Sequence, residues 1–64
     1  MPRLSITLGP PLDPWMEGFR AGRRAGRWGR RVANPYAGRT EPWAEAAREA
    51  WQNGYERGRE AALT

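Results

Sequence analysis

The sequence predicts an all-α protein in which two helices pack as an antiparallel hairpin behind an extended N-terminal arm. The first observation is an internal repeat, because the pattern Trp-x-x-Gly-aromatic-x-x-Gly-Arg-x-Ala occupies residues 15–25 and again residues 51–61. The second is the four-residue spacing of the glycines, which places them on one helix face. The third is that a segment containing proline precedes each copy and separates the two. Segments that share one packing pattern are expected to pack together, with a Gly/Ala-rich interface and an aromatic core.

Residues 1–12 are expected to form a separate arm, extended or disordered. Leu4, Ile6 and Leu8 alternate with other residues, which is a short strand pattern, and a Gly-Pro-Pro segment at residues 9–11 then interrupts regular structure. Because one strand cannot form a sheet alone, three interpretations remain: a disordered terminus, a segment packed over the helices, or a strand added to a partner's sheet. The three apolar side chains are therefore candidates for contact with a protein partner.

Residues 13–64 are expected to form the helical domain. Asp13 is a suitable N-cap and Pro14 a suitable first helical residue. Helix one should run over about residues 14–32, because Asn34 precedes a proline and is pushed away from helical dihedral angles.

The second helix is expected after a connection at residues 33–40. Thr40 is its expected N-cap, and Pro42 lies in its expected first turn. The alanine-rich sequence that follows favours a helix over about residues 41–62.

The glycines require a compensating interaction, since each costs about 1 kcal/mol relative to alanine inside a helix. A stripe of small residues offsets this cost by letting another helix approach closely. In helix one the stripe is Gly18, Gly22, Gly26 and Gly29, flanked by Trp15, Phe19 and Trp28. In helix two it is Ala47, Gly54 and Gly58, flanked by Trp43, Trp51 and Tyr55.

Charge is distributed unevenly. The net charge is +4 and the pI is about 11.1. Residues 14–33 hold six arginines and one glutamate, whereas residues 40–64 hold three arginines and five glutamates. On a helical wheel the six arginines share an arc of roughly 120° opposite the glycines, which predicts a phosphate-binding face; the alternative is a face that only keeps the protein in solution. These arginines are Arg20, Arg23, Arg24, Arg27, Arg30 and Arg31.

Two further candidates, Arg39 and Tyr36, lie in the connection. Asparagine before proline commonly starts a turn, and Tyr36 would then simply close the open end of the hairpin. In the alternative interpretation, Tyr36 is exposed near the arginines and stacks on an unpaired base. The tryptophans are expected in the core, with Trp28 and Trp43 the least secure because they lie near helix ends.

One residue breaks the repeat. Arg57 occupies the position of Ala21 in the first copy, so it either lies at the rim of the apolar face or contacts a partner. The mostly acidic outer face of helix two, opposite in charge to helix one, also allows copies of the protein to dock head to tail or as a dimer.

The composition excludes several functional classes. A 64-residue chain forms one domain and buries only about 60% of the surface of its unfolded form. With no cysteine and no histidine, it lacks disulfides, the common zinc ligands and the usual catalytic base or nucleophile. We therefore expect a cytoplasmic protein that is not an enzyme and needs no cofactor or metal. No stretch approaches the ~20 apolar residues of a membrane span.

Four motifs in a fixed order carry a resemblance to a known family. They are Gly18-Phe19-x-Ala21-Gly22, Gly26-Arg27, Asn34-Pro35-Tyr36 and Trp51-x-x-Gly54-Tyr55. Over about residues 15–60, this pattern resembles the ribosome modulation factor family and its small phage-borne relatives. The resemblance implies a two-helix protein that binds the small ribosomal subunit near the messenger exit region, contacts ribosomal RNA with basic side chains and promotes inactive ribosome dimers.

The leading functional hypothesis is thus a small, basic, non-catalytic modulator that binds ribosomal RNA and resembles a ribosome hibernation factor. One alternative is a phage-encoded inhibitor or adaptor directed at a protein, such as a CRISPR effector or an RNA polymerase. Another is a small self-associating structural component.

Overall fold

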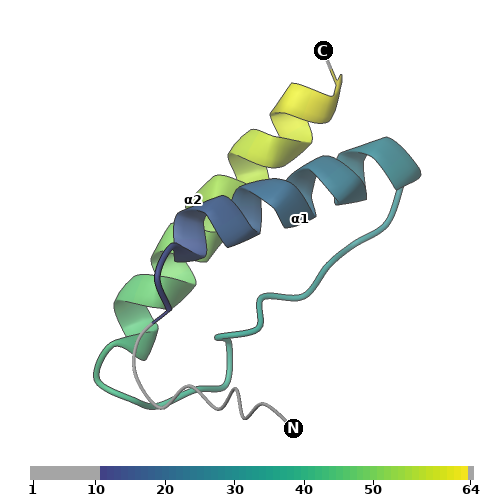
Figure 1. Ribbon diagram of the computed structural model, residues 1–64. Helices are drawn as coiled ribbons and strands as arrows, with labels where there is room; N and C mark the ends of the chain where they lie inside the picture. The colour runs from purple at the N-terminus through teal and green to yellow at the C-terminus, as the bar shows by residue number, and fades with distance from the viewer. Residues whose placement is uncertain (1–10, 64) are drawn as a thin grey trace, which may run out of the picture.

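The computed structural model describes residues 11–63 and contains two α-helices in this range, α1 (Pro14–Trp28) and α2 (Ala44–Leu63). No strand is present in the described part of the chain. The helices pack side by side along their length (Figure 1). The predicted all-α, two-helix fold is confirmed.

The two helices run in the same direction, so the antiparallel orientation expected from the sequence is wrong. Gly18 faces the backbone of Trp51, Gly22 that of Tyr55, and Gly26 that of Arg59, so the contacting positions rise together along both helices. Figure 1 shows the connection returning from the end of α1 to the start of α2. The protein is therefore a parallel helix pair joined by a long crossover.

The repeat explains this direction, because its two copies pack against each other in register. A methyl group added at Gly18 would overlap the Trp51 carbonyl, and one at Gly54 would overlap the Trp15 carbonyl, its counterpart in the other copy. In the same way, Gly22 faces Tyr55, and its counterpart Gly58 faces Phe19, the counterpart of Tyr55. Because this reciprocal contact recurs four residues further along both helices, the two copies run in parallel and are related by an approximate two-fold axis.

Helix α1 begins as predicted and ends earlier than predicted. The Asp13 carboxylate accepts a hydrogen bond from the Met16 N–H at 3.0 Å. Gly29 adopts the left-handed conformation (φ 68°), and the N–H groups of Gly29 and Arg30 both donate to the Ala25 carbonyl. This is a glycine C-cap, so Gly29 terminates the helix instead of extending the stripe, and the expected end at residue 32 is wrong.

Helix α2 begins at Ala44, three residues later than expected. Glu41 precedes a proline and is therefore disfavoured in helical dihedral angles, and a turn closed by a 2.9 Å hydrogen bond from the Ala44 N–H to the Glu41 carbonyl precedes the helix. Thr40 is thus too far from the first helical residue to cap it. The connection therefore covers residues 29–43, not 33–40. Because an extended chain spans up to about 3.6 Å per residue, this connection is long enough to return from the end of α1 to the start of α2.

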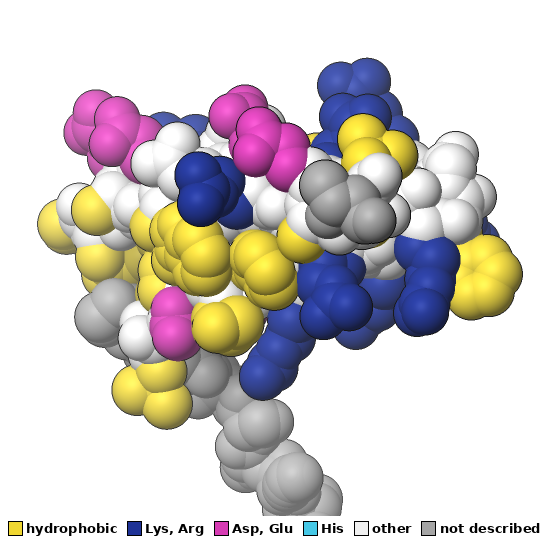
Figure 2. Space-filling model, turned by 90° about the horizontal axis from the view of Figure 1, so that it is seen from above, with side chains coloured by type: hydrophobic (Ala, Val, Ile, Leu, Met, Phe, Trp, Pro, Cys, Tyr) yellow, Lys and Arg dark blue, Asp and Glu magenta, His cyan; other side chains and the backbone are white. Residues whose placement is uncertain are grey.

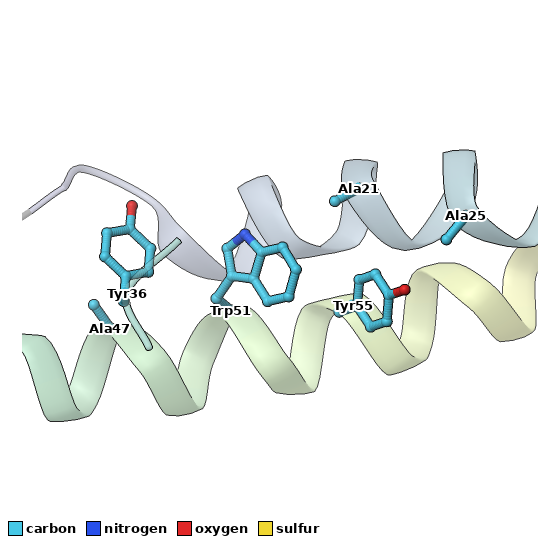
Figure 3. Packing of buried hydrophobic residues seen from close by; sticks show 6 residues of the cluster. All are labelled: Ala21, Ala25, Tyr36, Ala47, Trp51 and Tyr55. Atoms are coloured by element: carbon cyan, nitrogen blue, oxygen red, sulfur yellow. The ribbon is translucent and has the colours of Figure 1, made fainter. Parts of the chain in front are cut away.

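The core lies on the side of the helix pair that the connection covers. Trp51 and Tyr55 stack there with ring centroids 4.9 Å apart. Figure 3 shows the Trp51 ring between α2 and α1, with the Tyr55 ring beside it on α2. The buried cluster consists of Ala21, Ala25, Tyr36, Ala47, Trp51 and Tyr55. On the other side of the pair, the two-fold counterpart of this stack, Trp15 on Phe19 at 5.3 Å, is less covered: Trp15 is 37% exposed, whereas Trp51 is 3% exposed.

Candidate nucleic-acid interface

The turn at Asn34 fixes the connection to α2. The Asn34 side-chain oxygen accepts a hydrogen bond from the Tyr36 N–H at 2.9 Å, and its amide nitrogen donates to the Arg48 carbonyl at 3.0 Å. The Arg48 guanidinium in turn donates to the carbonyls of Tyr36 (3.1 Å) and Arg39 (2.9 Å). The expected turn is confirmed, and Arg48 holds it in place.

Tyr36 is buried and does not form part of a nucleic-acid surface. Its hydroxyl donates a 2.6 Å hydrogen bond to Glu17 of α1, and its ring packs edge-on against Trp43. Burial, followed by the hydrogen bond to the Glu17 carboxylate, raises the pKa of the Tyr36 hydroxyl to about 12. The stacking role considered for Tyr36 is therefore wrong, and its ring closes the core instead.

Arg39 is also occupied locally. Its guanidinium forms a bidentate ion pair with Glu41, with a shortest distance of 2.7 Å, and lies 5.2 Å from the centre of the Trp43 ring. The Arg39 hydrogen bond holds the pKa of the Glu41 carboxylate below its ordinary value. Arg39 thus differs from the helix arginines predicted with it, because its charge already has a partner.

Four arginines of α1 gather around one open hollow. All four are exposed, and together with Ala61 and Ala62 of α2 they line a space of about 410 Å³. Within residues 11–63 the only ion pair joins Arg39 to Glu41, so none of the four has a carboxylate partner there. We call this group the α1 arginine cluster: Arg20, Arg23, Arg24 and Arg27.

The basic surface continues beyond the end of α1. A second hollow, of about 470 Å³, lies between Arg24, Trp28 and Arg30. A third, of about 340 Å³, is lined by Arg30, Arg31 and Arg59. Because neighbouring hollows share Arg24 and then Arg30, the arginines form one continuous track around the C-terminal half of α1. Arg30 and Arg31 reach it from the connection, not from a helical arc.

Arg59 was not among the residues predicted for this site. The repeat contained the signal, since Arg59 is the counterpart of Arg23. In a parallel pair the two-fold axis brings these positions to the same end of the molecule, whereas in the expected antiparallel hairpin they would lie apart.

Charge is separated along the helix pair. Glu17 and Glu45 lie in the first turns of α1 and α2, and Arg27 lies in the last turn of α1. Acidic residues at helix N-termini and basic residues at C-termini complement the helix dipoles, which point the same way in a parallel pair; the last turn of α2, however, contains no basic residue. In Figure 2 most basic side chains gather toward the end where α1 terminates, and most acidic side chains toward the other end.

The tryptophans divide between core and surface. Trp51 is buried and Trp43 half-buried, as expected for core residues, whereas Trp28 is 69% exposed. The expectation that Trp28 packs in the core is wrong, because Gly29 ends the helix immediately after it and turns the chain away. Trp28 therefore lies at the surface, inside the arginine track.

The remaining predicted partner residues are Arg57 and three apolar residues of the N-terminal arm. Arg57 is exposed and forms no ion pair with any glutamate of the described chain, which agrees with a position at the rim. Leu4, Ile6 and Leu8 lie outside the described residues.

Residues 11–63 form neither a metal-binding cluster nor a membrane-spanning helix. No group of acidic side chains there has the arrangement of a metal site. Neither helix has the length and apolar character needed to cross a membrane.

Comparison of the chain with protein-family models, curated proteins and solved structures found no match.

Proposed function

We propose that this protein is a small non-catalytic modulator that binds RNA through the α1 arginine cluster, with ribosomal RNA of the small subunit as its target. One observation carries the proposal: four exposed arginines surround one hollow and none has a carboxylate partner among the described residues. An arrangement that only served solubility would be expected to mix both signs of charge.

The chemistry of the cluster fits phosphate. Each guanidinium keeps its charge at any working pH and offers a planar set of donors that matches phosphate oxygens. The cluster lies on a helix whose backbone is in close contact with a second helix at Gly18 and Gly22, so its spacing is held rigidly. Binding of this kind releases counterions and is strongly weakened by salt.

The ribosomal target is supported by the resemblance to the ribosome modulation factor family. The matching glycines and aromatic residues lie at the helix interface and in the Asn34 turn, where they build the scaffold. The arginines of the track provide the contacts that such a target would need. Hibernation of ribosomes in the cytoplasm is the activity that this scaffold and charge support.

The proposal is tested by reversing the charge of the cluster. The variant Arg20→Glu/Arg23→Glu/Arg24→Glu/Arg27→Glu should lose binding to purified small subunits in a sedimentation assay, while its thermal unfolding stays cooperative. The matched control replaces the same four residues with lysine and should retain most of the affinity, because the charge is kept. Full binding by the glutamate variant would overturn the proposal.

A second candidate function has one observation in its favour. The stack of Trp15 on Phe19 remains partly exposed on the side opposite the connection, and an exposed aromatic surface is typical of protein contacts. This favours an inhibitor or adaptor directed at a protein, the phage-encoded type of function considered above. Capture of one stoichiometric protein complex that survives nuclease, and loses affinity on Trp15→Ala, would support it over RNA binding.

A further inference from the structure

Trp28 is the most exposed aromatic residue in the described chain, at 69%. The Gly29 cap fixes its position: as the last helical residue, Trp28 stays on the surface while the chain turns away. A tryptophan offers a large rigid apolar face at low cost in conformational entropy. Such a residue inside a basic surface suits a ligand that is both flat and anionic.

The surroundings of Trp28 have the size and charge of a small-ligand site. The hollow beside it measures about 470 Å³ and is lined by Arg24, Ala25, Trp28, Arg30 and Val32, within the range of about 300–1,000 Å³ typical of ligand sites. Arg24 precedes Trp28 by one helical turn, so both side chains lie on the same helix face. Neither Arg24 nor Arg30 has a carboxylate partner within residues 11–63.

The far wall of the hollow is held in place. The Val32 N–H donates a 3.2 Å hydrogen bond to the hydroxyl of the buried Tyr55, and this bond attaches the connection to α2. The wall therefore does not depend on a ligand for its position, and the distance between Trp28 and Val32 is set by the fold.

We propose that this hollow binds an unpaired nucleotide, whose base stacks on the Trp28 indole while Arg24 and Arg30 contact the flanking phosphates. This inference rests on the proposed RNA binding and specifies its substrate class as RNA with single-stranded segments. A base within a duplex has both faces covered by its neighbours, so only an unpaired base can reach the indole. The α1 arginine cluster contacts phosphate in either form, and Trp28 adds the preference for single strands.

The other aromatic residues suit this role less well. Tyr36 is buried against Glu17 and Trp43. One face of Trp15 is already stacked on Phe19 at 5.3 Å. Trp28 alone combines high exposure with two free arginines in the same hollow.

The test compares two RNAs of equal phosphate number, an unstructured single strand and a fully paired duplex of two strands, by fluorescence anisotropy. Trp28→Leu should weaken binding of the single strand about tenfold and leave binding of the duplex within about twofold, the scale expected for one base stack. Trp28→Phe should restore most of the single-strand affinity. The matched control, Trp15→Leu, removes a partly exposed tryptophan outside the hollow and should not alter the ratio of the two affinities.

The outcomes separate this site from the proposed function. Equal loss for both RNAs, or no loss for either, in Trp28→Leu would overturn the nucleotide site. If, in the same experiments, the four-arginine reversal abolishes binding of both RNAs, the proposed RNA binding remains supported even though the nucleotide site is overturned. Failure of the unaltered protein to bind either RNA would overturn both.

Discussion

A methyl group on Gly22 would overlap the main-chain carbonyl of Tyr55, and one on Gly58 would overlap the carbonyl of Phe19, the counterpart of Tyr55 in the other copy of the repeat. The missing side chains therefore bring the two backbones together. At this separation a glycine Cα–H group lies against the facing carbonyl, a weak interaction that recurs at close helix contacts. The parallel pair depends on these positions.

Replacing Gly22 with alanine should destabilise the protein by about 1–3 kcal/mol, even though alanine is the better helix former. The added methyl group meets backbone atoms of α2, which cannot move aside as a flexible side chain could. Urea unfolding followed by circular dichroism measures the change. The control is Gly38→Ala, because a Cβ at Gly38 meets nothing within 4 Å; its free energy of unfolding should change by less than about 0.5 kcal/mol. Equal effects of the two substitutions would contradict the close helix contact.

Tyr36 should make the protein sensitive to alkaline pH. Because its pKa is raised from 10.0 in the unfolded chain to about 12 in the folded protein, its contribution to stability is complete below pH 10 and is lost as the pH rises from about 10 to about 12. The loss is on the order of 2 kcal/mol. Tyr36→Phe should remove this part of the pH dependence in urea titrations at successive pH values. An unchanged alkaline limb in that variant would show that another group is responsible.

Arg48 should stabilise the connection through its two hydrogen bonds to the carbonyls of Tyr36 and Arg39. Arg48→Met keeps much of the side-chain length but leaves the Arg39 carbonyl without its donor, while the Tyr36 carbonyl keeps only the Arg39 N–H at 3.2 Å. Loss of these two hydrogen bonds from a charged donor should cost about 1–3 kcal/mol. Backbone amides of residues 34–39 should also exchange faster with solvent. Arg57→Met is the control, since Arg57 is exposed and has no carboxylate partner in residues 11–63. A larger loss for Arg57→Met than for Arg48→Met would refute this assignment.

The salt dependence of RNA binding should identify which arginines contact phosphate. Arg24→Gln should make the plot of log affinity against log salt concentration shallower by about 0.7–0.9, the effect of one phosphate contact. Arg39→Gln should leave the slope unchanged, because the Arg39 charge is paired with Glu41. Identical slopes for Arg24→Gln and the unaltered protein would remove Arg24 from the interface.

The sequence was sufficient to predict that the two helices contact each other and, with the exception of Gly29, which glycines do so. Gly18, Gly22, Gly54 and Gly58 all lie at the interface, because the four-residue spacing fixes one helix face regardless of how the partner runs. The direction could not be read from spacing alone, since a stripe of small residues accepts a partner in either orientation. The direction of the helices depends on where each helix ends, because this sets the length of the connection. The sequence pattern places Gly29 in the stripe, whereas in the structure it is the C-cap that ends α1.

The candidate site, too, was predicted from the sequence only in part. The charge pattern predicted the α1 arginine cluster, because exposed charges on a regular helix follow its periodicity. The hydrogen bond to Glu17 places Tyr36 in the core, which agrees with the interpretation that its ring closes the hairpin and not with the base-stacking alternative. Trp28 was expected in the core, and the early end of α1 leaves it at the surface. Both outcomes depend on the path of the connection, which local sequence does not specify. The addition of Arg59 to the track follows from the parallel orientation alone.

The most direct test of the central claim is co-sedimentation of the tagged protein with ribosomes in a bacterial lysate. It is carried out at low and moderate salt, with and without nuclease, for the unaltered chain and the four-arginine reversal. We expect the unaltered protein to travel with small ribosomal subunits and to leave them at moderate salt or after nuclease. We expect the reversal not to bind. Association that survives both salt and nuclease, or that is equal for the reversal, would contradict binding to RNA through the α1 arginine cluster.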